Sequence, residues 1–134
     1  MNIDEIVDNF SLFDDWEDKY AYLIDLGRHL PPMDEALKTE ETRVKGCLSR
    51  VWMVLGRDAE GKIALYADSD ADIVKGLIAV LYAMYQGKTA KEAAAADIDG
   101  VFGKIGLDNH LFINRRNGFY AMVERIRSFT AGCK

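Results

Sequence analysis

One of the two cysteines, Cys47, stands where the chain turns into a strongly apolar stretch, in the run Lys45-Gly46-Cys47-Leu48-Ser49-Arg50-Val51-Trp52. Arg43, Lys45 and Arg50 surround it in sequence, and nearby positive charge favours the thiolate, the form of cysteine that attacks sulfur and other electrophiles. Gly46 permits backbone conformations and close approaches that a side chain would block. This local chemistry is compatible with a nucleophilic Cys47 and equally with a buried, inert cysteine that packs as a small hydrophobic residue.

The second cysteine, Cys133, is the penultimate residue of the sequence. Chain ends are usually exposed and mobile, so we expect Cys133 to be incidental, although it could act as a resolving partner for Cys47. His110 and Arg115 stand close together ahead of the last predicted helix. Taken alone, His110 is more typical of a histidine that hydrogen-bonds backbone carbonyls than of a catalytic one.

The sequence has no pattern typical of a metal centre or a nucleotide-binding loop. The soft and borderline metal ligands occur singly, without the paired spacing of zinc sites: His29, Cys47, His110 and Cys133. Neither GxGxxG nor GxxxxGK(S/T) occurs. An acidic cluster opens a predicted helix, where negative charge is stabilising, and we interpret it as structural: Asp14, Asp15, Glu17 and Asp18. We therefore expect this chain to bind no metal and no cofactor.

Composition predicts an ordinary globular protein. The 134 residues are 49% hydrophobic and 29% charged, enough for a sizeable core without disulfides or metals, and no Pro, Gly or Ser-rich stretch divides them. We expect a single domain over residues 1–134. The net charge of -5 argues against nucleic acid as a partner. No apolar run reaches membrane-spanning length and the N-terminus lacks the basic start of a signal peptide, so we expect a cytoplasmic protein with reduced thiols and no membrane partner.

Helical periodicity predicts an amphipathic helix over residues 3–10 and a second helix that begins in a capping box with Asp14 as the cap. The apolar stripe of the second helix, expected in the core, ends before Pro31-Pro32 and comprises Trp16, Tyr20, Leu23, Leu26 or Gly27, and Leu30. A further short helix is predicted within residues 32–38.

From Arg50 onward the apolar residues follow the period of a strand. Residues 51–55 are apolar on both faces, so both faces should be covered. A polar turn at residues 56–61 and a second alternating run at 63–67 complete an antiparallel hairpin. Residues 43–45 favour, more weakly, a short third strand.

Asp70 belongs to a second capping box, Ser69-Asp70-Ala71-Asp72, which should open a helix over residues 71–86 that is apolar on nearly every side. Gly87 suits the C-cap of this helix, and residues 89–92 cap a short alanine-rich helix. Another short helix is predicted at 99–105. Asn114 should cap a terminal helix whose apolar face comprises Phe119, Met122, Val123, Ile126 and Phe129.

Five motifs, in this order and spacing, resemble the SufE family over almost the whole chain. The specific part is the run Gly46-Cys47-Leu48-Ser49-Arg50-Val51-Trp52, followed at the right distance by Ser69-Asp70-Ala71-Asp72-Ile73-Val74-Lys75-Gly76-Leu77. The others are Trp16-Glu17-Asp18-Lys19-Tyr20, Leu26-Gly27-Arg28-His29-Leu30-Pro31, and His110-Leu111 with Arg115 and Gly118. Phe112-Ile113 and Phe119 depart from the family's usual Ser/Thr-Pro and Leu, and Arg50 resembles the CsdE branch.

SufE-like proteins accept sulfur from a group II cysteine desulfurase, and their fold resembles that of the iron–sulfur scaffold protein IscU. The resemblance implies an α+β sandwich with a small antiparallel sheet packed against helices. It also implies that Cys47 is the thiol that receives persulfide sulfur. The resemblance also implies supporting residues around the loop that carries Cys47: Gly46, Asp70, His110 and Arg115.

The implied partners are a desulfurase of the SufS or CsdA type, which carries its own pyridoxal phosphate, and a downstream iron–sulfur scaffold or other sulfur acceptor. This chain would be an accessory sulfur carrier and activator of the desulfurase. Two alternatives stay open: a dithiol redox protein that cycles Cys47 and Cys133 through a disulfide, and a regulator that acts by binding alone.

Overall fold

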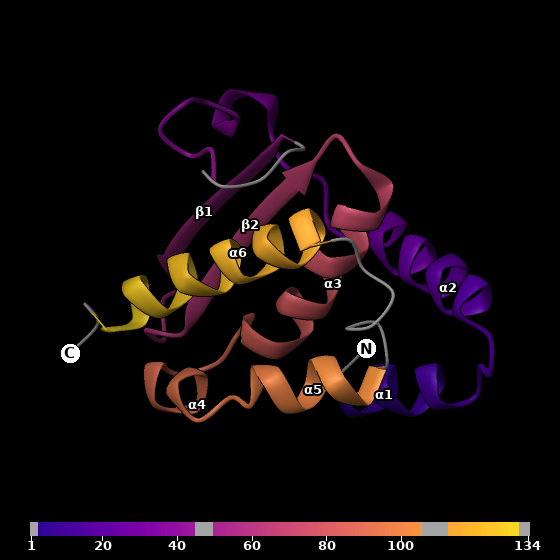
Figure 1. Cartoon of the computed structure of the whole chain (residues 1–134). Coiled ribbons are helices and arrows are strands. Elements are labelled where there is room, and N and C mark those ends of the chain that lie inside the picture. Colours follow the sequence, from indigo (N-terminus) through magenta and orange to yellow (C-terminus); the bar gives the residue numbers. More distant parts are fainter. Residues whose placement is uncertain (1–2, 45–49, 106–112, 132–134) are drawn as a thin grey trace.

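The computed structural model describes residues 3–44, 50–105 and 113–131, except that the side chains of 113–117 and 131 are left aside (Figure 1). In chain order the elements are α1 (Ile3–Ser11), α2 (Trp16–Arg28), a 3-10 turn (Glu35–Leu37), β1 (Val51–Arg57), β2 (Ile63–Ser69), α3 (Asp72–Tyr85), α4 (Ala90–Ala94), α5 (Ile98–Ile105) and α6 (Ile113–Ala131). Within the described residues one two-stranded antiparallel sheet packs against helices. The predicted α+β class is confirmed.

The hairpin pairs β1 with β2 from Val51↔Ser69 to Arg57↔Ile63. Its turn is held by Asp58, whose carboxylate accepts hydrogen bonds from the amides of Glu60 and Lys62, at 2.9 Å each. Gly61, at φ +79°, adopts a left-handed conformation that favours glycine. The predicted hairpin is thus confirmed.

The two faces of the sheet are covered differently. Residues such as Met53 and its partner Ala67 are buried on the inner face, against α3 and α6. Figure 1 shows α6 running across the hairpin on this side. On the outer face Trp52 is half-buried, but Tyr66 is 50% exposed. The expectation of cover on both faces concerned residues 51–55 of β1, and all five are buried or half-buried. The exposed Tyr66 belongs to β2.

Helix α3 forms the centre of the core, as its apolar sequence predicts. Its buried residues include Leu77, Ile78, Val80 and Leu81. Helix α2 lies so close to α3 that a Cβ on Gly76 would collide with Leu23, and one on Gly27 would lie 2.7 Å from the amide nitrogen of Gly76. The two glycines therefore set the distance between these helices.

The remaining helices close the other sides of the core. The ring of Phe102 in α5 stacks on Phe119 in α6 at 4.9 Å between centroids, and Met122, Val123 and Ile126 are buried below it. The capping box of α4 forms as predicted, with Thr89 accepting from the Glu92 amide while the Glu92 carboxylate accepts from the Thr89 amide.

Two predicted helix starts were wrong, that of α2 by one residue and that of α6 by two. Asp15, not Asp14, caps α2 and accepts from the Glu17 amide at 2.7 Å. Trp16 is therefore the first helical residue, beyond the α2–α3 contact, and is 46% exposed rather than in the core. Helix α6 begins at Ile113, so Asn114 lies inside the first turn instead of capping it.

The predicted third strand is reduced to an isolated bridge between Arg43 and Trp52. Lys45, the last residue of that prediction, lies outside the described residues. The short helix expected within residues 32–38 is the 3-10 turn Glu35–Leu37.

Candidate functional site

The chain on the N-terminal side of Cys47 is fastened to β1. The Val44 amide donates to the Val51 carbonyl and the Met53 amide to the Thr42 carbonyl, both at 2.8 Å. We call residues 41–44 the entry arm. Val44 is only 3% exposed, so the arm ends in the core. Gly46 and Cys47 belong to residues 45–49, which lie outside the described residues.

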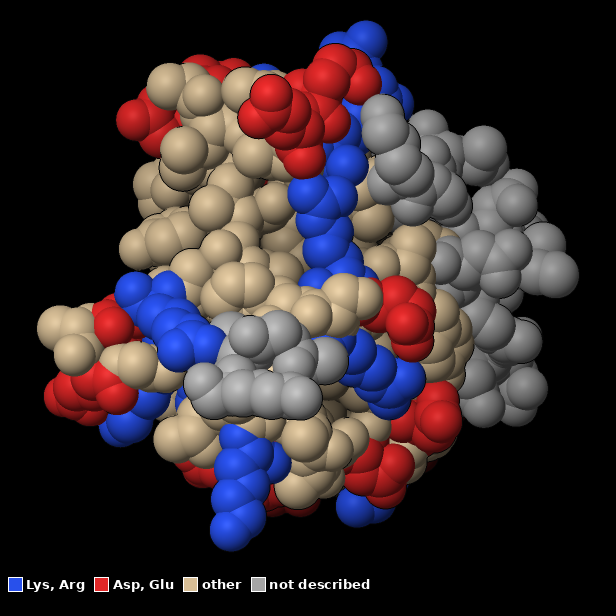
Figure 2. All heavy atoms as spheres, turned by 90° about the vertical axis from the view of Figure 1, so that its left-hand side faces the viewer, with Lys and Arg blue, Asp and Glu red and all other residues tan. Residues whose placement is uncertain are grey.

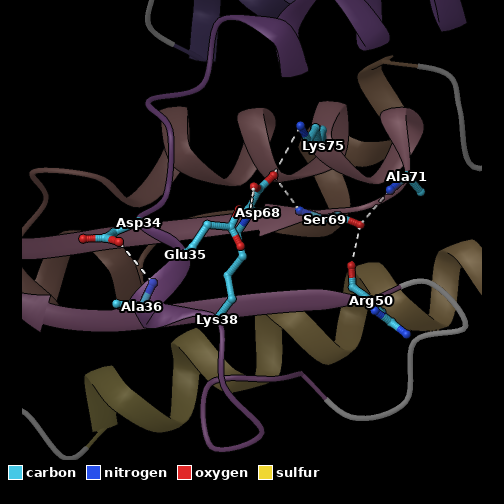
Figure 3. A network of polar contacts seen from close by, with 9 residues as sticks. All are labelled: Asp34, Glu35, Ala36, Lys38, Arg50, Asp68, Ser69, Ala71 and Lys75. Atoms are coloured by element: carbon cyan, nitrogen blue, oxygen red, sulfur yellow. Dashed lines mark hydrogen bonds and ion pairs between the residues drawn. The ribbon is translucent and has the colours of Figure 1, made fainter.

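The chain resumes at Arg50, which is fastened to the end of β2 (Figure 3). The Ser69 hydroxyl donates to the Arg50 carbonyl at 2.7 Å, as Figure 3 shows. The Asp70 amide donates to the same carbonyl at 3.2 Å. The Asp70 carboxylate accepts from the Arg50 amide at 3.0 Å. The predicted site residue Asp70 therefore lies beside Arg50, the residue that directly follows the segment 45–49 containing Cys47.

This arrangement corrects the predicted capping box at Ser69-Asp70-Ala71-Asp72. Helix α3 begins at Asp72 with Ala71 as its N-cap, and no side chain caps it. Ser69 is still the last residue of β2, paired with Val51, and its hydroxyl accepts from the Ala71 amide at 3.2 Å. Short polar side chains that suit a helix cap serve here to tie Arg50 across the hairpin.

A second polar cluster lies on the outer face of the hairpin and was missed in the sequence. Lys38, from the segment before β1, contacts the carboxylates of Asp68 at 2.8 Å and Glu35 at 2.9 Å (Figure 3). Its ammonium also lies 5.4 Å from the ring centroid of Trp52, the cross-strand neighbour of Asp68. Lys75 of α3 reaches the other oxygen of Asp68 at 3.4 Å.

The charges of this cluster stabilise one another. Partial burial alone would raise the pKa of the Asp68 carboxyl, but the Lys38 ion pair, the Ser69 amide and Lys75 outweigh it and hold that pKa below its ordinary value. The hydrogen bond to Asp68, with that to Glu35, raises the pKa of Lys38. Both groups are therefore held in their charged forms.

Arg125 of α6 reaches the entry arm from the opposite side. Its two terminal nitrogens donate to the carbonyls of Arg43 and Glu41, at 2.9 Å each. No motif pointed to Arg125, because 82 residues separate it from Arg43 in the sequence. The same helix carries Arg115 in its first turn.

The other predicted site residues are not placed by the structure. His110 and Cys133 lie outside the described residues, and of Arg115 only the backbone position in α6 is described. His29, one of the single metal-ligand types, has its Nδ1 2.8 Å from the Asp25 carbonyl at the end of α2. Across the described residues, no group of three or more His, Cys, Asp or Glu side chains could hold a metal ion.

The family model for SufE, described as an Fe-S metabolism associated domain, matches residues 4–130. This chain belongs to the SufE family. An uncharacterised SufE-like protein of Rhizobium meliloti (strain 1021) is 44% identical over 134 residues, covering 98% of this chain and 96% of that protein. Another from Rhizobium etli is 47% identical over 129 residues, covering 94% of this chain and 87% of that protein.

The fold is shared more widely than the sequence. The solution structure of a hypothetical protein from Thermus thermophilus matches with a TM-score of 0.77 at 18% identity, covering 98% of this chain and 94% of that one. At this identity the likeness concerns the fold alone.

On the face of this SufE-family chain that lies to the left in Figure 1, acidic and basic side chains are interspersed (Figure 2). Exposed pairs of opposite charge, such as Lys62 with Glu60 at 3.1 Å, stabilise a fold little. Among the described residues, no helix is both long enough and apolar enough to cross a membrane.

Proposed function

We propose that this chain is a sulfur acceptor and activator for a pyridoxal phosphate-dependent cysteine desulfurase. It would receive persulfide sulfur on Cys47 and relay it toward iron–sulfur cluster assembly. Membership of the SufE family, which is associated with Fe-S metabolism, supports the process. The choice of Cys47 rests on the motif Gly46-Cys47-Leu48-Ser49-Arg50-Val51-Trp52, which resembles that of the SufE family. The structural observation that supports it is that Val44 and Arg50, which flank residues 45–49, are both hydrogen-bonded to the hairpin.

The chemical step is a displacement at sulfur. The Cys47 thiolate attacks the outer sulfur of a persulfide on the desulfurase, a new S–S bond forms, and the S–S bond of the partner breaks. The partner's cysteine leaves as a thiolate, so no outside oxidant or reductant is needed. The proton that Cys47 loses passes to solvent or to a base, for which His110 is the candidate.

The neighbouring residues have supporting roles in this proposal. Asp70 holds Arg50 at the C-terminal end of the segment, and Gly46 permits the backbone to pass close to a partner. A positive charge at Arg115 would favour the thiolate of Cys47. The pyridoxal phosphate belongs to the partner.

Mass spectrometry tests the acceptor residue directly. The protein is incubated with a cysteine desulfurase, pyridoxal phosphate and cysteine, and then digested without reductant. We expect the mass of one added sulfur atom on the peptide that contains Cys47, and none in the Cys47→Ser variant. Absence of that mass, with a desulfurase that is demonstrably active, would contradict the proposal.

Two further variants separate the alternatives. If Cys47 and Cys133 cycled through a disulfide, Cys133→Ser would abolish turnover, whereas we expect sulfur acceptance to survive it. If the protein acted by binding alone, Cys47→Ser would still stimulate the desulfurase, whereas we expect the stimulation to be lost.

A further inference from the structure

The entry arm, residues 41–44, makes hydrogen bonds along both of its edges. The arm begins in a turn over residues 40–42 and continues into the bridge residue Arg43. The Thr42 carbonyl accepts from the Met53 amide of β1 on one edge. The carbonyls on either side of it, those of Glu41 and Arg43, accept from Arg125 on the other edge.

Arg125 therefore binds the two carbonyls of the arm that flank the Thr42 carbonyl, which is bound to β1. A guanidinium is planar and carries its donors in a fixed fork, so one side chain can bind two acceptors at once. Both bonds are 2.9 Å long and charge-assisted, a class about twice as strong as neutral hydrogen bonds. Without Arg125 the outer edge of the arm would have to be satisfied by water.

The helix that carries Arg125 is itself fixed by the core. Met122, Val123 and Ile126, on either side of it in sequence, are 1%, 0% and 0% exposed. The position of the arm is thus set by α6 as well as by the hairpin. Besides the bridge to Trp52, the Thr42 hydroxyl ties the arm to the Leu37 carbonyl at 2.6 Å, and Arg125 adds the two contacts that come from α6.

We propose that Arg125 is a positioning residue for the entry arm, the described stretch that precedes the segment containing the acceptor cysteine. Its fork fixes the outer edge of the entry arm and so determines where the chain enters the segment that contains Cys47. The role of Cys47 as acceptor rests on the proposed function, but the contact between Arg125 and the arm does not.

The test uses the full chain with Cys133→Ser, so that Cys47 is its single thiol. Arg125→Lys keeps the charge but loses the fork, and Arg125→Met removes both. The matched controls are Arg127→Lys and Arg127→Met, since Arg127 lies on the same helix, is exposed, and forms a local ion pair with Glu124 at 3.5 Å. Amide hydrogen exchange is measured at Val44 and Met53, the two amides that bind the arm to β1.

We expect exchange at these two amides to accelerate about tenfold in both Arg125 variants and to stay within about twofold in the Arg127 variants. In the same Arg125 variants, the rate of Cys47 alkylation by iodoacetamide should rise by about threefold or more. Amides in the centre of α3 report on global stability and should change less than Val44 and Met53. A general loss of stability would move all of these amides together.

Unchanged exchange at Val44 and Met53 in Arg125→Lys would overturn the proposal, as would equal acceleration in the Arg127 variants. Full protection in Arg125→Lys with loss in Arg125→Met would mean that charge suffices, which also contradicts a role for the fork. None of these measurements needs a desulfurase. A protein that shows the Arg125 effect but never gains sulfur on Cys47 would therefore refute the proposed function and leave the positioning role standing.

Discussion

At the scale of single residues, Ser69 and Asp70 show how one set of side chains can suit two structures. Both residue types favour helix N-caps, and both stand just before α3. In the folded protein their side chains bind the backbone of Arg50 instead, 19 and 20 residues away. The physical consequence is that the end of the Cys47 segment is attached to the hairpin rather than to the helix.

We predict that Ser69→Ala lowers the free energy of unfolding by about 1–3 kcal/mol, because Ser69 is 3% exposed and its hydroxyl satisfies the Arg50 carbonyl. Ser11→Ala is the matched control, since the Ser11 hydroxyl also donates to a backbone carbonyl but is exposed, and it should cost no more than about 0.5 kcal/mol. Urea unfolding measures both. Equal losses in the two variants would show that the hydrogen bond from Ser69 to the Arg50 carbonyl stabilises the fold no more than an exposed one does.

At the scale of elements, the contact between α2 and α3 determines the geometry of the core. Two glycines, Gly27 and Gly76, face each other where the helices approach, so backbone meets backbone. The start of α3 follows directly from Asp70, and its Lys75 reaches Asp68. The packing of α2 therefore helps to hold the end of β2 where it binds Arg50.

We predict that Gly76→Ala and Gly27→Ala each lower the free energy of unfolding by about 2 kcal/mol or more, because the added Cβ would collide with backbone that cannot move separately from its helix. Gly103→Ala is the control: it lies in α5, where an added Cβ would have nothing within 4 Å. It should be neutral or stabilise by up to about 1 kcal/mol through its higher helix propensity. Thermal or urea unfolding measures the free energy of unfolding. Equal values for the three variants would contradict a close backbone contact at Gly27 and Gly76.

At the scale of the whole molecule, stability should decline on both sides of neutral pH. Because the pKa of Asp68 is lower in the folded protein, its ion pairs stabilise the fold above the ordinary carboxyl pKa, and this contribution is lost as the pH falls through the lowered value. Burial raises the pKa of the Tyr85 phenol, although the charge of Arg127 opposes it. The contribution of Tyr85 is therefore present below its ordinary pKa and lost as the pH rises through the raised value.

Urea midpoints measured across the pH range test both limbs. The stability difference between the parent protein and Asp68→Asn should narrow below about pH 4, and Tyr85→Phe should decline less steeply than the parent above about pH 10. A difference for Asp68→Asn that stayed constant into acid would show that the Lys38–Asp68 pair does not favour the charged carboxylate.

The local elements were predictable from sequence because their signals come from near neighbours. Alternation of apolar residues indicated β1 and β2, helical periodicity indicated α3, and the capping box at Thr89 formed as expected. The motif around Cys47 and Asp70 likewise resembled the SufE family, and the family model confirms that membership. Errors at helix starts were shifts of one residue at Asp15 and two at Ile113. The capping box before α3 did not form, and the weakly predicted third strand is only a bridge.

Only the tertiary structure decided which backbone each polar side chain binds. Nothing in the local sequence distinguishes Ser69 as a cap from Ser69 as a tie to Arg50, and nothing marks Arg125, rather than Arg127, as the residue that reaches the entry arm. These contacts join residues 19 to 84 positions apart, so they exist only once α6 and the hairpin have packed on α3. Periodicity and capping are fixed by neighbours along the chain, whereas the partner of a side chain is fixed by what the fold brings beside it.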